Sequence, residues 1–359
     1  MEARKNFSAI KDVHIEICLN EAVESRQTTG LEEVTLTAGF AGFSASEIDT
    51  GIHFVGKHVS LPLLISPLTG GGQSSERINR HLALAANQLG IGMAVGSQNP
   101  MLEGKAEPDS YLVRKYAPSI PLLANLGLAQ VKRGREYLLR AVESIRADAI
   151  VLYVNPLQEI LQEGGDADYT GVLEKLEEVL DGFPYPVLLK EVGFGLPDAL
   201  LTWAGDRNIA GVDVAGLGGT NWARIEGRIR GRDFSVFEEL GRQTKEVLLA
   251  GRIHLRGDQY LIASGGIRAG LDMAKALALG AHMVSMALPF LRWANVSVDE
   301  VVRNVEQLRE ELRVAMLYTG SKEITALRGK AEVQKNGSIS SIQSVSSRDQ
   351  RDQTTRKTK

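Results

Sequence analysis

Eight short apolar segments, each followed by a segment whose apolar residues have helical spacing, predict that the chain folds as a TIM (β/α)8 barrel. The apolar segments are nearly continuous rather than alternating in hydrophobicity, which is typical of parallel strands buried on both faces. The competing fold is a doubly wound open sheet, but no Gly-x-Gly-x-x-Gly motif follows the first apolar segment. The predicted strands cover residues 61–66, 90–96, 121–127, 149–155, 186–192, 209–216, 260–266 and 281–287.

The remaining segments divide the chain into an N-terminal extension, the barrel and a C-terminal tail. Residues 1–60 precede the first strand, and their segment KDVHIEICLNEAV predicts a helix that packs on the barrel. The barrel takes residues 61–330, and we expect its charged stretch at 227–258 to be a long loop that acts as a lid or a partner surface. Residues 331–359 are rich in Ser, Gln, Thr and Lys, which predicts a disordered tail.

The composition excludes several classes of protein. Of the 359 residues, 43% are hydrophobic, and the net charge of −3 argues against binding to nucleic acid or anionic membranes, which requires clustered Lys and Arg. The single cysteine, Cys18, excludes an internal disulfide framework and a Cys-rich zinc site. There is no signal-peptide pattern and no apolar stretch near the roughly 20 residues of a membrane helix. We therefore expect a cytoplasmic protein without membrane insertion.

Polar residues follow nearly every predicted strand, at the end of the barrel where active sites of this fold lie. No single residue is decisive, but together they predict a binding site at the barrel mouth. They are Ser66, Thr69, Ser97, Gln98, Asn125, Asn155, Gln158, Glu159, Lys190, Thr220, Glu226 and Arg268.

The segment SGGIR at residues 264–268 predicts a phosphate site. TIM barrels commonly bind a phosphate between the loops after strands seven and eight, at the N-terminus of a helix. Gly265 and Gly266 would let the backbone approach the phosphate with no Cβ in the way, and Gly219 and Thr220 would add donors from the neighbouring loop. The alternative interpretation of the glycine pair is a tight turn that binds nothing.

Lys190 ends the fifth predicted strand, where an unpaired ammonium group would be costly. It therefore needs an anionic partner. That partner is either Glu191 or Asp213 in the protein, or the electron-rich N1–C2=O edge of a reduced flavin. A phosphate at the rim and a lysine deeper inside together predict FMN lying across the barrel mouth.

The motifs SPLTGG, VGSQ, NPLQE, KEVGFG, VDVAGLGGTNW and IASGGIRAGLDMAKALALGA, in this order, resemble those of the type 2 isopentenyl diphosphate isomerases. The resemblance runs from about residue 10 to residue 329. It implies an FMN-dependent TIM barrel that interconverts isopentenyl and dimethylallyl diphosphate by proton transfer. It also implies reduced FMN and Mg²⁺ as cofactors, NADPH as reductant, a small isoprenoid substrate, and a homo-oligomer that is a tetramer or larger.

The resemblance also implies roles for individual residues. Gln158 would lie beside the reacting carbon skeleton, Glu226 would relay protons with it, His14 would help to hold the substrate, and Glu159 would hold Mg²⁺. The implied substrate contacts are Lys11, Gln98, Asn155 and Gln158. The implied FMN contacts are Pro67, Leu68, Thr69, Ser97, Asn125, Lys190, Thr220, Gly265, Gly266, Ile267, Arg268, Ala287 and Leu288.

Each of three ionisable residues also has a purely structural interpretation. Glu159 follows Asn–Pro and would serve as an acidic residue at a helix start. Glu226 would pair with Arg224 or Arg228, and His14 would be a histidine satisfied within its own helix.

Four substitutions separate the sequence from this family. Ile10, Asn99 and Leu217 stand where the family has arginine, and Tyr153 stands where it has histidine. In the family the positions of Ile10, Asn99 and Tyr153 hold the diphosphate of the substrate. Arginine suits bidentate phosphate contacts, so each loss could cost roughly 1.5–3 kcal/mol of binding.

These departures leave alternatives to the family's activity open. Other cations, such as Arg4, Lys5, Lys11 or Lys105, would compensate for the lost residues and keep the activity. A diverged paralogue would instead use reduced FMN for double-bond isomerisation or cyclisation of a different, uncharged isoprenoid. An FMN-dependent oxidoreductase of the hydroxy-acid oxidase type and a non-catalytic FMN-binding protein are the remaining candidates.

Overall fold

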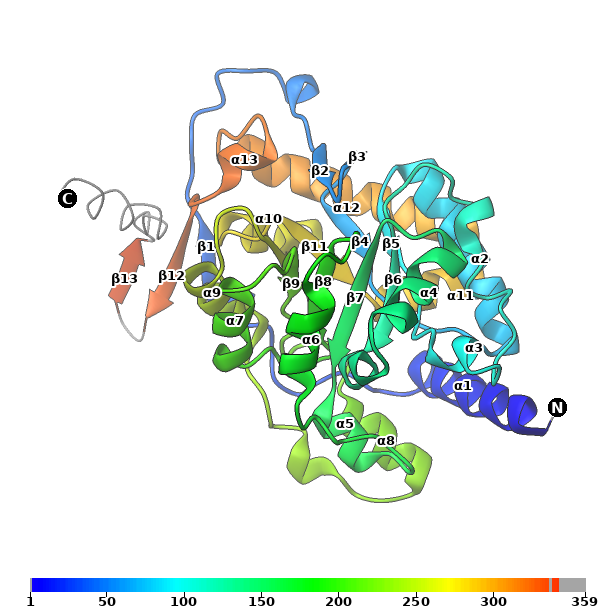
Figure 1. Ribbon diagram of the computed structural model, residues 1–359. Coiled ribbons are helices and arrows are strands. Elements are labelled where there is room, and N and C mark those ends of the chain that lie inside the picture. Colours follow the sequence, from blue (N-terminus) through cyan, green and yellow to red (C-terminus); the bar gives the residue numbers. More distant parts are fainter. Residues whose placement is uncertain (1, 336–337, 342–359) are drawn as a thin grey trace.

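The computed structural model describes residues 2–335 and 338–341, with side chains described for residues 11–334. It contains the predicted barrel: eight parallel strands close in the order β10-β11-β4-β5-β6-β7-β8-β9 (Figure 1). All eight predicted strands are present, and each is shorter than predicted. They are β4 (Leu63–Ile65), β5 (Gly92–Ala94), β6 (Leu122–Gly127), β7 (Ala149–Val154), β8 (Val187–Glu191), β9 (Gly211–Asp213), β10 (Tyr260–Ala263) and β11 (Met283–Met286).

The helices that connect the strands pack around the outside of the barrel and bury one apolar face each (Figure 1). In α2, for example, Ile78, Leu82, Ala86 and Leu89 recur at helical spacing and are all buried. The covering helices are α2 (Gln73–Leu89), α4 (Arg135–Ile145), α6 (Val172–Leu180), α7 (Asp198–Gly205), α9 (Thr244–His254), α10 (Gly270–Ala278) and α12 (Val298–Tyr318).

Four further helices follow the carboxyl ends of strands and so border the barrel mouth. Two of them, α5 and α8, lie side by side (Figure 1). The four are α3 (Asn99–Leu102), α5 (Pro156–Leu161), α8 (Trp222–Arg230) and α11 (Leu288–Val296). Short 3-10 or α-helical turns complete the connections: η1 (Leu31–Glu33), η2 (Ala45–Glu47), η3 (Val113–Lys115), η4 (Leu128–Arg133), η5 (Ser235–Phe237) and α13 (Ile324–Leu327).

The hairpin β2 (Ile52–Phe54) and β3 (Lys57–Val59) closes the opposite end of the barrel. Phe54 and Val59 are fully buried and join the apolar cluster that fills the barrel interior. The Phe54 ring contacts the ring of Tyr260 edge to face, with 4.9 Å between the centroids. The interior is therefore a packed core that is open only at the mouth.

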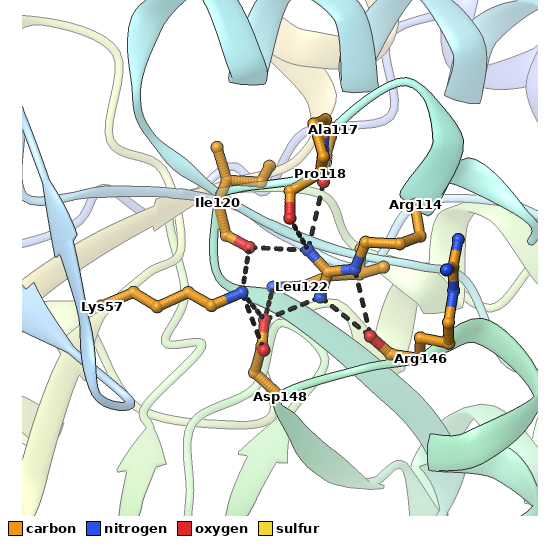
Figure 2. Close-up of polar contacts among 8 residues, drawn as sticks. All are labelled: Lys57, Arg114, Ala117, Pro118, Ile120, Leu122, Arg146 and Asp148. Carbon is orange, nitrogen blue, oxygen red and sulfur yellow. Dashed lines mark hydrogen bonds and ion pairs between the residues drawn. The ribbon is translucent and has the colours of Figure 1, made fainter.

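A charged cluster fastens this hairpin to the barrel (Figure 2). The Asp148 carboxylate, just before β7, accepts hydrogen bonds from Lys57 Nζ at 2.9 Å and Arg114 Nη2 at 2.7 Å. It also accepts one from the backbone N–H of Leu122, at the start of β6, at 2.9 Å. Burial acts to raise the pKa of Asp148, but these three donors outweigh it and hold the pKa below its ordinary value.

The N-terminal helix α1 (Glu2–Asn20) is longer than the predicted helix and packs on α2, α8 and α11, as expected for a helix lying on the barrel. After it, the chain runs along the loop that follows β9. The backbone N–H of Ser25 donates to the carbonyl of Gly219 at 2.7 Å, and the Asn221 N–H donates to that of Val23 at 2.8 Å. This segment therefore supports a loop at the barrel mouth.

The expectation of one long loop at residues 227–258 is wrong. The segment contains the end of α8 and the whole of α9, which covers the barrel between β9 and β10. Val247, Leu248 and Ala250 are buried on one face of α9, and Lys245 is neutralised by Glu33 at 2.5 Å. Only residues 231–243 connect the two helices.

The first residues of the predicted disordered tail are ordered. Ala331–Lys335 form β12, which pairs antiparallel with β1 (Val34–Leu36) and with β13 (Ser338–Ser341). Ala331 and Val333 are buried, so the pairing is held by an apolar face as well as by backbone hydrogen bonds. The rest of the predicted tail, residues 342–359, lies outside the described residues. Among the described helices, none has the length and apolar character needed to span a membrane.

Candidate functional site

A cavity of about 420 Å³, its open mouth included, lies at the carboxyl ends of β4, β8, β9, β10 and β11. It brings together eight of the predicted FMN contacts: Lys190, Thr220, Gly265, Gly266, Ile267, Arg268, Ala287 and Leu288. Its lining also includes Gly219, which the sequence predicts as a phosphate donor, and residues that were not among the predicted FMN contacts: Ser66, Val192, Gly193, Ala215, Ser264, Ser285 and Met286.

The loop after β10 has a backbone shape that only glycine tolerates. Gly265 and Gly266 have φ values of 99° and 74°. A Cβ at Gly265 would lie 2.0 Å from the carbonyl oxygen of Gly216, and one at Gly219 would lie 2.7 Å from the Gly266 nitrogen. Together with the N-terminus of α11, which begins at Leu288, these bare backbones form a cradle that fits a phosphate group.

The side chain of Arg268 also lines this cavity, but it has a protein partner. Its guanidinium forms an ion pair with Glu24, in the segment that follows α1. The N-terminal segment thus fixes Arg268 at the mouth, a contact between residues 244 positions apart that sequence spacing does not reveal.

Lys190 is buried at the end of β8, and its anionic protein partner is Asp213 rather than Glu191. The Lys190 Nζ atom lies 3.2 Å from Asp213 Oδ2 and 3.4 Å from Ser264 Oγ. Ser264 in turn donates to Asp213 Oδ1. The ammonium group is therefore held at the cavity wall in a fixed position.

Glu191 organises the loop beside Lys190. One oxygen of its buried carboxyl group accepts the backbone N–H groups of Gly193 and Phe194 at 2.5 Å and of Gly195 at 3.1 Å. Burial raises the pKa of Glu191 to about 7, although these hydrogen bonds and Lys190 act in the opposite direction. Gly193 lines the cavity, so Glu191 fixes part of its wall.

Two buried polar atoms fit a bound cofactor. Within the described part of the chain, neither Asn125 Oδ1 nor Ser285 Oγ has a hydrogen-bond partner. Such groups are costly to bury unless a ligand or water satisfies them. Asn125 lies in β6 and Ser285 in β11, and both point to a polar ligand in the barrel mouth.

Four other predicted FMN contacts lie at strand ends but are not in the lining of this cavity. Pro67, Leu68 and Thr69 follow β4, and the Thr69 hydroxyl lies 2.7 Å from that of Ser75. Ser97 follows β5, and its hydroxyl accepts from the phenol of Tyr153 at 3.2 Å. Burial raises the pKa of Tyr153 to about 12, so the phenol keeps its proton as a donor.

The predicted catalytic residues meet where α5 and α8 face each other. Gln158 Nε2 donates to Glu226 Oε1 at 3.4 Å, and Asn155 Nδ2 donates to Gln158 Oε1 at 3.0 Å. Asn155 also donates to Glu159 Oε1 at 2.8 Å, so one amide orients two neighbouring side chains. Glu226 is buried, with 2% of its surface exposed.

His14 and Lys11 reach the same cluster from α1. His14 Nε2 lies 3.9 Å from Glu226 Oε1, its ring packs edge to face on Trp222, and its buried Nδ1 has no partner among the described residues. Burial lowers the pKa of Lys11, an effect opposed by the charges of Glu226 and Glu159. The structure thus brings together His14, Lys11, Gln158, Glu159 and Glu226.

Glu159 is the predicted metal ligand. Its Oε2 accepts from Gln162 Nε2 at 2.6 Å and from the Asp166 N–H at 2.7 Å. In the described part of the chain, no group of three or more His, Cys, Asp or Glu side chains is arranged to hold a metal ion. A Mg²⁺ ion here would therefore take one protein carboxylate and complete its shell with substrate oxygens and water, which is common for this ion.

A second cavity opens beside this cluster, between α1, α5 and α8. Its empty volume is about 1,050 Å³, open solvent included. It is lined by His14, Gln162, Glu163, Glu226, Ile229, Arg230 and Arg232.

Gln98 is placed differently from the prediction. It is fully buried, and its amide nitrogen donates to the Ala141 carbonyl at 2.8 Å while its oxygen accepts from the Asn125 N–H at 3.0 Å. Both the nitrogen and the oxygen of the amide therefore bond to the protein beneath the barrel mouth, and neither is left to bind a substrate. Sequence reasoning could not show this, because the polarity of a strand-end residue does not reveal which way it points.

The described residues at the positions that differ from the family make contacts within the protein. The Asn99 amide oxygen accepts from the Tyr137 hydroxyl at 2.6 Å, and Leu217 is fully buried and absent from the lining of both cavities. Ile10 lies on α1, and its side chain is outside the described part of the structure.

The family described as FMN-dependent dehydrogenase matches residues 173–334, which include β8 to β11 and hence most of the first cavity. Among solved structures, a mandelate oxidase superposes with a TM-score of 0.60 over 93% of this chain and 97% of its own, at 20% identity. A flavocytochrome b2 superposes with a TM-score of 0.66 over 88% of this chain and 82% of its own, at 18% identity. At this identity, these structures show a shared fold alone.

Curated relatives are much more similar in sequence. The isopentenyl-diphosphate delta-isomerase of Mycolicibacterium vanbaalenii is 41% identical over 88% of this chain and 94% of its own length. Those of Deinococcus radiodurans and Cronobacter sakazakii are 41% and 40% identical and cover 88% and 90% of this chain, and 95% and 96% of their own lengths. With these relatives and the FMN-dependent family match, this chain belongs to the type 2, FMN-dependent isopentenyl-diphosphate delta-isomerase family.

Proposed function

We propose that this protein is an isomerase that interconverts isopentenyl and dimethylallyl diphosphate by proton transfer, with reduced FMN in the first cavity. The observation that carries the proposal is the hydrogen-bonded pair Gln158 and Glu226, at 3.4 Å, at the same end of the barrel as a cavity that fits a flavin phosphate. The curated relatives bear the name of this reaction. The solved mandelate oxidase and flavocytochrome b2 share only the fold with this chain, so they give no support to the hydroxy-acid oxidase alternative.

The residues of the first cavity fit FMN. The glycine loop 264–268 and the start of α11 would hold its phosphate, and Thr220 would add a donor from the adjacent loop. Asn125 would use its unpaired oxygen, and Lys190 would balance negative charge on the reduced flavin. When bound and reduced, FMN supplies a group that exchanges protons and stabilises positive charge developing on the substrate. Pro67, Leu68, Thr69 and Ser97 would complete the site from the ends of β4 and β5.

Glu226 is the group in this cluster that would hold and release a proton, because its partner Gln158 is an amide. The isomerisation removes one proton from carbon and adds another, so it is redox-neutral and needs such a group near the substrate. His14, 3.9 Å from Glu226, and Lys11 would keep the carboxylate and the bound substrate in position. Asn155 would orient Gln158 and Glu159 together.

The remaining components of the proposal follow the family resemblance. Glu159 would hold Mg²⁺ against the diphosphate of the substrate, and NADPH would supply the electrons that reduce FMN. The enzyme would work in the cytoplasm as a homo-oligomer, a tetramer or larger. The single buried Cys18, with a pKa raised to about 11 by burial, suits a reducing compartment because it stays an unreactive thiol.

An isomerase assay tests this proposal. The purified protein is loaded with FMN, reduced under anaerobic conditions, and given isopentenyl diphosphate with Mg²⁺. We expect dimethylallyl diphosphate to form with reduced FMN and Mg²⁺, and turnover to fall to background with oxidised FMN or after chelation of Mg²⁺. FMN that binds and is reduced without any turnover would exclude the proposal.

The second candidate is a diverged paralogue that isomerises or cyclises an uncharged isoprenoid. The observation that favours it concerns three positions where the family has Arg or His. Asn99 and Tyr153 form hydrogen bonds with neighbouring residues, and Leu217 is fully buried. Turnover of an uncharged isoprenoid alcohol, with none of the diphosphate, would support this candidate.

A further inference from the structure

Helix α8 carries three arginines and a fourth, Arg232, follows its end; their surroundings divide these four residues into two pairs. Arg224 forms an ion pair with Glu238 at 2.8 Å, and Arg228 forms one with Glu21 at 3.0 Å. Arg230, at the last turn of α8, and Arg232, just beyond it, both line the second cavity. Among the residues whose side chains the structure describes, no carboxylate forms an ion pair with either of them.

Arg230 is fixed so that it faces the candidate catalytic cluster. It lies four residues after Glu226, which places both side chains on the same face of α8. Its Nη1 donates to the carbonyl of Leu161 at 2.7 Å, which ties α8 to the end of α5, and its guanidinium lies 5.9 Å from the centre of the Phe234 ring. A guanidinium has five N–H groups, so most of its donors are still available for a ligand.

We propose that Arg230 and Arg232 bind the anionic end group of the substrate, which is a diphosphate if the proposed function holds. Two guanidinium groups beside one cavity match a diphosphate, because arginine donates bidentate hydrogen bonds to phosphate oxygens. The cavity also holds Glu226, so an anion bound by the arginines would carry its hydrocarbon end toward Gln158.

The carboxylate of Glu163 on the same cavity wall determines the form of the ligand. A bare diphosphate would be repelled by Glu163 and Glu226. A diphosphate that carries Mg²⁺ has less net negative charge, and the predicted metal ligand Glu159 is one hydrogen bond away, through Gln162 Nε2 at 2.6 Å. The site therefore suits a magnesium diphosphate complex.

The test uses inorganic pyrophosphate with Mg²⁺, titrated calorimetrically into the FMN-loaded protein. We expect Arg230→Ala and Arg232→Ala each to raise the Kd for pyrophosphate by about tenfold or more, which is the loss of one charge-assisted contact. The matched control is Arg228→Ala, which removes an arginine from the same helix but outside the cavity. Unchanged flavin absorbance and circular dichroism show that each variant is folded. If Arg230→Ala does not fold, Arg232→Ala still tests the proposal, because Arg232 is exposed and its replacement does not disturb the core.

In the isomerase assay, the same two variants should raise KM for isopentenyl diphosphate and change kcat little, since contacts made equally in ground and transition states affect binding alone. Pyrophosphate affinity that is unchanged in both variants, or equally weakened by Arg228→Ala, overturns the proposal, as does wild-type protein that binds no pyrophosphate. Wild-type protein that binds pyrophosphate through these arginines but turns over no isopentenyl diphosphate refutes the proposed function and leaves the anion site standing.

Discussion

At Gly265 a single missing Cβ decides whether the first cavity keeps its shape. Gly265 has a φ of 99°, and a Cβ there would lie 2.0 Å from the Gly216 carbonyl oxygen. Gly265→Ala must therefore displace the loop. We expect a loss of about 1–3 kcal/mol in the free energy of unfolding and at least a tenfold weaker affinity for FMN. Flavin fluorescence titration measures the affinity.

The control for this substitution is Gly257→Ala. Gly257 is exposed, and nothing lies within 4 Å of its hypothetical Cβ. It should bind FMN like the wild type. Equal FMN affinity in Gly265→Ala would show that this loop does not hold the cofactor.

Glu226→Gln tests the proton-transfer role directly, because it keeps the size of the side chain and removes the ionisable group. We expect kcat for isopentenyl diphosphate to fall by about 100-fold or more, the usual contribution of a general acid or base. FMN content should not change, since Glu226 does not line the first cavity. Glu21→Gln, which alters only the surface ion pair with Arg228, serves as the control, and a similar kcat in both variants would remove Glu226 from the mechanism.

At this scale the sequence was informative wherever the residue type itself defines the chemistry. The glycine pair 265–266 indicates a cofactor site because a backbone without Cβ atoms can approach a phosphate. Lys190 at a strand end indicates one because a buried ammonium group needs an anionic partner. The orientation of Gln98 and the pairing of Arg268 with Glu24 were not predictable, since both depend on how distant segments pack.

At the scale of elements, the ionic cluster around Asp148 holds the β2–β3 hairpin against the closed end of the barrel (Figure 2). Asp148→Ala removes an acceptor from Lys57, Arg114 and the Leu122 N–H. We expect a loss of about 2–3 kcal/mol in the free energy of unfolding at pH 7, the scale of hydrogen bonds to a charged group. Urea denaturation measures it. Asp168→Ala, which breaks the exposed pair with Lys132, should cost much less, because water screens that pair.

The same cluster predicts a pH dependence. Because the pKa of Asp148 is lowered by folding, its stabilising contribution is fully present above the ordinary value of 3.8 and is lost as the pH falls through the lower folded pKa. The stability difference between wild type and Asp148→Asn should therefore shrink as the pH is lowered from 5 toward 2. A difference that is constant over this range would contradict the ionic account.

The elements that sequence reasoning missed share a physical cause. In α9 the charges at 245, 246 and 252 obscured an apolar face, and Lys245 is tolerated because Glu33 pairs with it across the fold. Among the side chains of β12 that the structure describes, at residues 331–334, Ala331 and Val333 are the buried ones, and two apolar residues are too short a signal to separate from a polar tail. Both elements are stabilised by distant partners rather than by their own pattern.

For the whole molecule, the barrel followed from the sequence because the strands of the barrel are buried on both faces and every covering helix has one apolar face. The arrangement of the N-terminal segment did not follow. Helix α1 brings His14 to Glu226, 212 residues further along the chain, and the segment after it supports the loop at Gly219.

This arrangement predicts that FMN stabilises the fold as a whole. The cavity joins the ends of β4, β8, β9, β10 and β11, so a ligand bound there stabilises the native state over the unfolded chain. At FMN concentrations about 100-fold above Kd, the gain should be about 2.7 kcal/mol. Thermal unfolding of the apoprotein with and without FMN should show a higher Tm with the cofactor, and an equal Tm would mean that FMN does not bind the native fold.

The measurement that tests the central claim most directly is deuterium incorporation by the reduced, FMN-loaded protein in D₂O with Mg²⁺ and isopentenyl diphosphate. If Glu226 and Gln158 carry out proton exchange at a bound isoprenoid, mass spectrometry will find solvent deuterium in dimethylallyl diphosphate, and Glu226→Gln will slow the appearance of the label by about 100-fold or more. Product that forms without deuterium, or label that persists at the wild-type rate in Glu226→Gln, would contradict this account.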